Sequence, residues 1–254
     1  MIHPTAIIEK GAEIADDAVV GPYCVIGAHA VIGAGTRLMS HVAIDGRTTI
    51  GSSCTIHPFA SLGGPPQDIT YKNEETTCLI GNNNVIREYV TVNRGTKSHG
   101  STEVGDNNFI MAYSHIAHDC VVGSNVIMAN CATLGGHVHV DDFASLMGLC
   151  AIHQFCRVGK YAFVGGITGV PMDVPPFVMA AGSRATLHGL NVVGLERRGF
   201  SREEIATLKK AYRILFRSSL PLQASLEQIE EELHGEHVRE LVAFIRASER
   251  GICR

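Results

Sequence analysis

The chain has 254 residues, of which 45% are hydrophobic, and this is enough for one large domain or two modest ones. Its formal net charge of −4 argues against a general nucleic-acid-binding protein. No run of about 18 apolar residues and no signal peptide occurs, so we expect a cytoplasmic protein without transmembrane helices, whose eight cysteines stay reduced.

An aliphatic residue recurs at every sixth position over most of the first 170 residues. An α-helix repeats every ~3.6 residues and an alternating strand every ~2, so neither produces this period, whereas the hexapeptide repeats of a parallel β-helix do. Three such repeats form a triangular coil of about 18 residues, in which the aliphatic side chain points inward. The repeat positions are Ile8, Ile14, Val20, Ile26, Ile32, Leu38, Ile44, Ile50, Ile56, Leu62, Ile80, Ile86, Val92, Val104, Ile110, Ile116, Val122, Met128, Leu134, Val140, Leu146, Ile152, Val158, Val164 and Val170.

Two segments interrupt the repeat, at residues 64–78 and 94–103. Both are polar and rich in turn-forming residues, so we expect loops that project from the β-helix. Loops on a rigid scaffold often carry functional residues. The predicted β-helical domain therefore covers residues 1–184 and includes these two loops.

The cysteines follow the same period. Most of them stand two residues before a repeat aliphatic, at a position that is otherwise small. A free cysteine packs well as a small buried side chain, and this argues against Cys120 as a nucleophile. The cysteines in this column are Cys24, Cys54, Cys78, Cys120, Cys150 and Cys156.

A helical domain is predicted over residues 185–254. A short helix is expected at about 188–197, Ser201 and Glu204 form a capping box for the next helix, and two further amphipathic helices follow. Basic residues Lys209, Arg213 and Arg217 are spaced four apart on one helix face. This face is either simply solvated or a docking surface for an acidic partner or a phosphate-rich ligand.

The segment 114–120 reads SHIAHDC and gathers several reactive side chains. Residues 18 apart in a β-helix stack at about 4.8 Å, the spacing of adjacent strands. Gly136 follows His118 by 18 residues, and His137 follows Asp119 by the same interval. The edge predicted in this way contains His118, Asp119, Gly136, His137, His153 and Gln154.

Two chemistries compete for this edge. Several histidines suggest a metal site, as in metal-binding enzymes built on the same repeat, but the spacing of three between His115 and His118 does not favour joint ligation. The alternative is a general base, His118, oriented by Asp119 or by a backbone carbonyl. Gly136, with no side chain, offers a backbone N–H to a developing oxyanion, and this combination is typical of acyl transfer.

The motifs HIAHDC (115–120), GGHV (135–138), HQFC (153–156), VGGITGVPMDVPPFV (164–178) and GLNVVGLERRGFSREEI (189–205) together resemble the UDP-N-acetylglucosamine O-acyltransferase (LpxA) family over essentially the whole chain. The resemblance implies a left-handed parallel β-helix with a C-terminal helical domain, assembled as a homotrimer with active sites between neighbouring subunits. It implies transfer of a (3R)-hydroxyacyl group from acyl carrier protein to the 3-position of UDP-N-acetylglucosamine, the first step of lipid A biosynthesis. Neither a cofactor, a metal nor a covalent intermediate is implied.

The resemblance also assigns roles by position. His118 matches the general base, Asp119 its orienting partner and Gly136 the oxyanion donor. Asp68 matches a sugar-contacting residue from a neighbouring subunit, and Gly166 matches the position that limits acyl length, where a bare glycine suggests a relatively long chain. The remaining matches to substrate-binding positions are His115, His137, His153, Gln154, Asn191, Arg197 and Arg198.

Four positions depart from the pattern common in the family, namely Asn93, Thr70, Val193 and Arg184. These departures leave open the acyl length and the acceptor, which in some relatives is a 3-amino UDP-sugar that yields an amide. The N-acyltransferases of the next acylation step are disfavoured, because they carry an extra domain before the hexapeptides, which here begin by residue 8. A metal-dependent hydratase on the same scaffold remains the alternative from another class.

Overall fold

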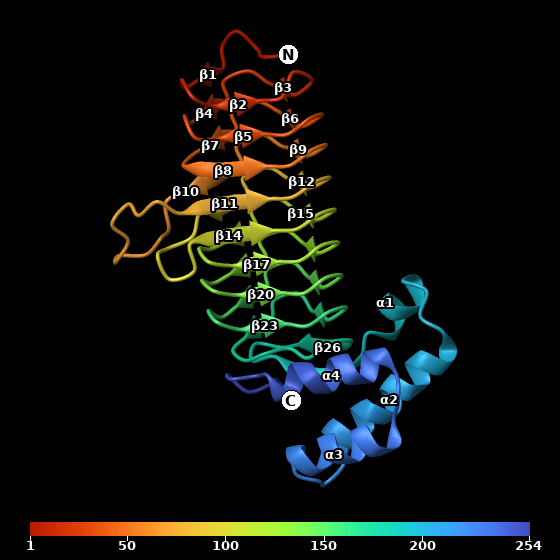
Figure 1. Ribbon diagram of the computed structural model, residues 1–254. Coiled ribbons are helices and arrows are strands. Elements are labelled where there is room, and N and C mark those ends of the chain that lie inside the picture. Colours follow the sequence, from red (N-terminus) through yellow and green to blue (C-terminus); the bar gives the residue numbers. More distant parts are fainter.

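The computed structural model describes residues 1–254 and is a triangular β-helix with a group of helices at its C-terminal end (Figure 1). The chain passes in turn through three sheets, here called sheets 1, 2 and 3, and neighbouring strands within each sheet are parallel except at the end of sheet 3. Most strands have two residues, and the second is the repeat aliphatic. The six-residue period therefore predicted the architecture correctly.

The strands of sheet 1 are, in spatial order, β1 (Ile7–Ile8), β4 (Val25–Ile26), β7 (Ala43–Ile44), β10 (Ser61–Gly64), β13 (Thr91–Asn93), β16 (His115–Ile116), β19 (Thr133–Leu134), β22 (Ala151–Ile152) and β25 (Gly169–Val170). Those of sheet 2 are β2 (Glu13–Ile14), β5 (Val31–Ile32), β8 (Arg47–Ile50), β11 (Thr77–Ile80), β14 (Ser101–Val104), β17 (Val121–Val122), β20 (His139–Val140) and β23 (Arg157–Val158). Those of sheet 3 are β3 (Val19–Val20), β6 (Arg37–Leu38), β9 (Thr55–Ile56), β12 (Val85–Ile86), β15 (Phe109–Ile110), β18 (Ile127–Met128), β21 (Ser145–Leu146), β24 (Phe163–Val164), β26 (Val178–Ala181) and β27 (Thr186–Leu190).

The interior of the prism is a continuous apolar column. Every repeat aliphatic from Val20 onward is buried, and so are the six cysteines predicted to pack beside them. Burial raises the pKa of the Cys120 thiol to about 12, so this thiol stays protonated near neutral pH. The predicted packing role of these cysteines is confirmed.

Both loops leave the prism at the corner between sheets 1 and 2, which we call corner 1/2 (Figure 1). They are shorter than predicted, because β10, β11 and β14 extend into the polar segments. The irregular backbone covers only residues 65–76 and 94–100. The same corner carries the turn of residues 117–120, so the fold brings the loops and the His118 segment to one edge.

The C-terminal part differs from the sequence prediction at its start. Residues 186–190 form β27, which pairs antiparallel with β26, so the helix expected at about 188–197 is confined to α1 (Val192–Arg197). The chain thus adds one more strand to sheet 3 beyond the predicted boundary at residue 184. The other helices are α2 (Arg202–Arg217), α3 (Leu222–Glu232) and α4 (Glu236–Arg246).

The predicted capping box begins α2. The Ser201 hydroxyl accepts a hydrogen bond from the Glu204 N–H, and the Glu204 carboxylate accepts one from the Ser201 N–H. The buried face of α2 contains Ile205, Leu208 and Leu215. No helix in the structure combines the length and the apolar character needed to cross a membrane.

Candidate active site

His118 and Asp119 form a hydrogen-bonded pair in the turn that follows β16. Nδ1 of His118 lies 2.8 Å from Oδ2 of Asp119. The Asp119 side chain has no exposed surface, whereas that of His118 is 15% exposed. With Nδ1 bonded to the carboxylate, Nε2 is left as the nitrogen available to a substrate.

The Asp119 carboxylate also accepts hydrogen bonds from the loop of residues 94–100. The Thr96 N–H lies 2.8 Å from Oδ1 and the Thr96 hydroxyl 2.7 Å from Oδ2. Burial by itself would raise the pKa of Asp119, but the hydrogen bonds from His118 and Thr96 outweigh it and lower this pKa below its usual value. Asp119 is therefore a charged, fully bonded partner for His118 near neutral pH.

Gly136 lies directly against the His118 ring, as the 18-residue stacking predicted. A Cβ placed on Gly136 would stand 2.6 Å from Cε1 and 2.8 Å from Nε2 of His118, closer than side chains normally approach. The Gly136 N–H donates no hydrogen bond within the chain. An unpaired backbone donor therefore lies beside the free nitrogen of the imidazole, the arrangement that stabilises a developing oxyanion.

Two more histidines flank this pair. The His137 ring packs edge-on against His118, with centroids 5.3 Å apart, and stacks on Phe155 on its other side. The Nδ1 of His115 lies 2.7 Å from the Thr91 hydroxyl on the neighbouring strand of sheet 1. Burial lowers the pKa of both His115 and His137, which favours neutral imidazoles able to hydrogen-bond a substrate.

The same cluster has the composition of a metal site. One potential ligand atom from each of His118, Asp119 and His137 lies within 4.8 Å of the other two. The Asp119 oxygens, however, already accept hydrogen bonds from Thr96 and His118. A metal ion bound to either ring nitrogen of His118 would replace the proton that this nitrogen holds or accepts, and it would remove the base.

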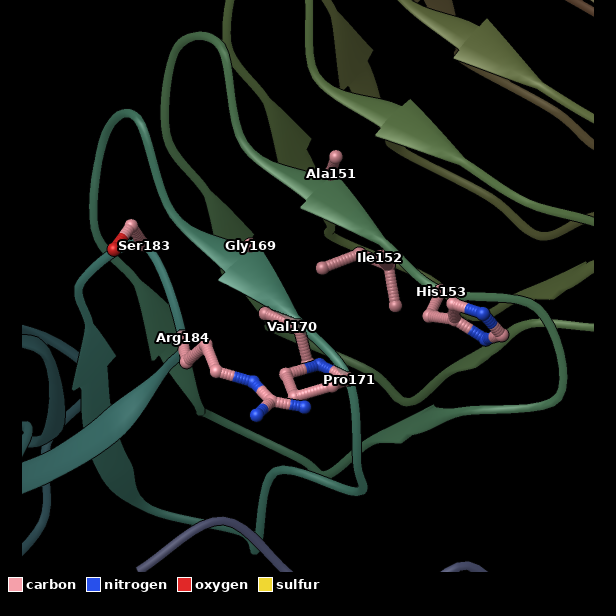
Figure 2. A pocket seen from close by; sticks show the side chains of 8 residues that line it. All are labelled: Ala151, Ile152, His153, Gly169, Val170, Pro171, Ser183 and Arg184. Atoms are coloured by element: carbon pink, nitrogen blue, oxygen red, sulfur yellow. The ribbon is translucent and has the colours of Figure 1, made fainter.

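His153 and Gln154 follow β22 at the same edge, but the structure gives them other neighbours. His153 lines a pocket formed by the last strands of sheet 1, with Arg184 extending below Val170 towards Pro171 (Figure 2). Its Nδ1 lies 3.3 Å from an Arg250 guanidinium nitrogen. Gln154 is exposed. His153 therefore shares its pocket with Arg184, and the repeat pattern contained no signal for its contact with Arg250.

Of the remaining predicted site residues, Asp68 lies at the same corner as His118, and the others lie at different corners. Asp68 is in the exposed loop of residues 65–76 of corner 1/2, where hydrogen bonds from the Thr70 N–H and hydroxyl lower its pKa, with small contributions from the charges of His118 and His137. The resemblance implies that this residue reaches the site of a neighbouring subunit; within its own chain it lies at corner 1/2, which also carries His118. Gly166 lies at the corner between sheets 3 and 1, which we call corner 3/1.

Asn191 and the two arginines lie at the third corner, between sheets 2 and 3. The Asn191 side chain caps α1 by accepting from the Gly194 N–H and donates to the Tyr161 carbonyl. The Arg198 guanidinium stacks over Phe143 at 4.9 Å, and both Arg197 and Arg198 are exposed. A single chain thus gathers His118, Asp119, Gly136, His115, His137 and Asp68 at one edge, but it places Gly166, Asn191, Arg197 and Arg198 elsewhere.

Known proteins are similar to this chain over its whole length. Residues 173–253 match the family described as Udp N-acetylglucosamine O-acyltransferase, Domain 2, and residues 1–34 and 101–136 match the bacterial transferase hexapeptide family. The acyl-[acyl-carrier-protein]–UDP-N-acetylglucosamine O-acyltransferase of Thermodesulfovibrio yellowstonii is 58% identical over 255 residues, covering 100% of this chain and 99% of the relative. That of a Janthinobacterium species is 50% identical with the same coverage.

Solved structures confirm the fold. The UDP-N-acetylglucosamine acyltransferase of Bacteroides fragilis is 40% identical and superposes with a TM-score of 0.98, with 100% of both chains covered. The corresponding protein of Acinetobacter baumannii is 44% identical with a TM-score of 0.97, covering 100% of this chain and 99% of that one. The architecture is therefore the predicted left-handed parallel β-helix with a helical C-terminal part, and the chain belongs to the UDP-N-acetylglucosamine O-acyltransferase family.

Proposed function

We propose that this protein transfers a (3R)-hydroxyacyl group from acyl carrier protein to the 3-hydroxyl of UDP-N-acetylglucosamine, as the first step of lipid A biosynthesis. The names of its relatives supply the reaction class, the donor and the acceptor. The observation that carries the chemistry is the His118–Asp119 pair with its free nitrogen beside the unpaired Gly136 N–H. The cytoplasmic location expected from the sequence belongs to the same proposal.

The reaction needs one base and one oxyanion donor, and the acyl group is never bonded covalently to the enzyme. Nε2 of His118 accepts the proton of the acceptor hydroxyl, whose oxygen forms a bond to the thioester carbonyl carbon. The carbonyl oxygen becomes an oxyanion and accepts a hydrogen bond from the Gly136 N–H. The carbon–sulfur bond of this tetrahedral intermediate then breaks, and the protonated His118 gives the proton to the leaving thiolate.

The second substrate, a carrier protein, requires a docking surface. Lys209, Arg213 and Arg217 are all exposed along one side of α2, next to its buried apolar face. Exposed positive charges on one face attract an acidic protein and increase its rate of association. We assign this face to the acyl carrier protein, and the exposed pair Arg197 and Arg198 to phosphate groups of the substrates.

We also propose a homotrimer, and two features support it. The predicted substrate-binding residues occupy all three corners of one prism, so they meet only where neighbouring prisms touch. Corner 3/1 carries a row of exposed and mostly apolar side chains, including Tyr89 and Tyr113 stacked at 4.9 Å, which favours contact with another chain. The row consists of Tyr23, His41, Phe59, Tyr89, Tyr113, Leu149 and Ile167.

Light scattering is expected to report three times the 27.2 kDa mass of one chain. Tyr113→Glu places a charge within the apolar row and is expected to yield monomers that keep the β-sheet circular dichroism signal but lose activity. Leu79→Glu, at an exposed position on sheet 2, is the matched control and should remain trimeric. A monomeric wild-type protein with full activity would contradict the proposal.

The substrates can be identified in one assay. The protein is incubated with hydroxyacyl carrier proteins of several chain lengths and with UDP-N-acetylglucosamine or its 3-amino analogue, and products are identified by mass. We expect the ester as the main product and, because Gly166 has no side chain, a preference for a relatively long acyl chain. A product formed only from the 3-amino sugar would instead assign the amide-forming reaction, and no product from either sugar would contradict acyl transfer.

A further inference from the structure

We propose that Thr96, in the loop of residues 94–100, is a positioning residue that holds the Asp119 carboxylate in the place from which it orients His118. The inference rests on the proposed function, in which His118 is the base. Thr96 belongs to no hexapeptide, so the repeat pattern contains no indication of this role.

The contacts between Thr96 and Asp119 are short and shielded from water. Thr96 supplies two donors, its N–H to Oδ1 at 2.8 Å and its hydroxyl to Oδ2 at 2.7 Å. Oδ2 is also the oxygen that accepts from His118 Nδ1 at 2.8 Å. Thr96 is 7% exposed and the Asp119 side chain is fully buried, so no bulk water replaces these donors. Asp119 therefore depends on Thr96 as well as on His118 for its orientation.

The loop is itself anchored to the prism, which gives Thr96 a defined place. The Gly95 N–H donates to the Thr77 carbonyl at 3.0 Å, and the Gly100 N–H donates to the Thr96 carbonyl at 2.7 Å. The Ser98 N–H donates to the Thr96 hydroxyl oxygen at 3.2 Å, which leaves the hydroxyl proton for Asp119. A Cβ at Gly95 would meet the Ser101 backbone at 2.5 Å, so the loop closes this tightly only with glycine there.

The strand after the loop binds the backbone N–H of Asp119. Thr102, on β14, accepts a hydrogen bond from the Asp119 N–H at 2.8 Å through its hydroxyl oxygen. Asp119 has a φ of 60°, in the left-handed region. One chain segment, from Thr96 to Thr102, thus holds both the backbone and the side chain of this residue, and we infer that the loop exists in part to fix the orientation of the base.

The predicted consequence of losing the hydroxyl is specific. Thr96→Val keeps the branched shape and the backbone donor but leaves Oδ2 with His118 Nδ1, at 2.8 Å, as its one short contact, and with His137 Nε2 farther away at 3.5 Å. The carboxylate then turns more freely and attracts the protonated imidazole more strongly. We expect kcat to fall about 10-fold, because the base spends less time correctly oriented. We expect the acid limb of the kcat/KM profile to move up by about 0.5–1 pH unit.

The other charged groups near His118 are the same in the wild-type protein and in Thr96→Val, so they do not account for a shift of the acid limb. They are Asp119, His115 and His137, with Asp68 and His99 from the loops. Thr96→Ser, which retains the hydroxyl, should recover most of the rate and the wild-type profile. Thr36→Val is the matched control, because the buried Thr36 hydroxyl bonds only backbone groups of the early coils, so this variant should lose stability without a change in kcat or in the profile.

The experiment measures kcat and kcat/KM against pH for Thr96→Val, Thr96→Ser and Thr36→Val, with melting temperature and solution mass as checks on folding. Thr96→Val is then combined with Asp119→Ala. If Thr96 acts through Asp119, the Thr96→Val substitution lowers kcat in the wild-type background but not in the Asp119→Ala background. Equal effects in both backgrounds, or a Thr96→Val variant with wild-type kcat and profile, would overturn the inference. His118→Ala is assayed in parallel: if it is fully active, the proposed base is wrong, whereas if it is inactive and Thr96→Val is unaffected, only the role of Thr96 is wrong.

Discussion

Replacing His118 with alanine is expected to lower kcat by about 10²–10⁴-fold, because the acceptor hydroxyl then loses its proton to water. The change removes a side chain at a turn and not in the apolar column, so the chain should still fold and keep its solution mass. Product formation from a hydroxyacyl carrier protein and UDP-N-acetylglucosamine measures the rate. Circular dichroism and light scattering measure folding and assembly.

The matched control is His139→Ala. The His139 side chain is 45% exposed on sheet 2 and pairs with Asp141 at 2.9 Å, away from the His118 cluster. The His139→Ala variant should therefore keep the wild-type rate. Near-wild-type turnover in His118→Ala would contradict the assignment of the base, and an equal loss in His139→Ala would indicate a general effect of removing a surface histidine.

Replacing Gly136 with alanine is expected to lower kcat about 100-fold although only one methyl group is added. The new Cβ would stand 2.6 Å from Cε1 of His118, so the imidazole must move away from the place where Asp119 holds it. The methyl group also hinders the approach of the thioester carbonyl to the Gly136 N–H. Both effects act on the transition state, so kcat should change more than KM.

Two comparisons isolate the cause of this loss. Gly27→Ala adds a methyl group at the same corner far from His118, where the nearest atom is the Ile44 carbonyl oxygen at 3.3 Å, and should leave the rate unchanged. In a His118→Ala background the ring is absent, so Gly136→Ala should cause only the smaller loss that comes from the oxyanion donor. Full activity of Gly136→Ala would show that the base does not operate from the position seen here.

Most of the fold can be predicted from the spacing of residues along the chain. A strict six-residue period leaves few structures other than a triangular coil, since each aliphatic must reach the same interior column. The period also places residues 18 apart on top of one another, and for that reason the sequence alone predicts that Gly136 lies against His118. The capping box of Ser201 and Glu204 can also be predicted, because its two residues are only three apart in the sequence.

The prediction was weakest where the chain leaves the period. The helix expected at about 188–197 begins only at residue 192, because residues 186–190 form β27 and pair with β26 at the open end of sheet 3. The local sequence does not reveal this pairing. The loop ends were misplaced by a few residues for a similar reason, since neighbouring strands extend the pairing into polar segments.

By itself, the sequence therefore determined the β-helix, the inward column of aliphatic residues and cysteines, and the pairing of His118 with Gly136, because all of these depend on a fixed repeat. Only the tertiary structure decided that Thr96 holds Asp119, that Arg250 meets His153, and that Gly166 and Asn191 lie at other corners than His118. These relations depend on irregular loops and on the closing end of the prism, where contacts between distant segments are made by three-dimensional packing and not by any period in the chain.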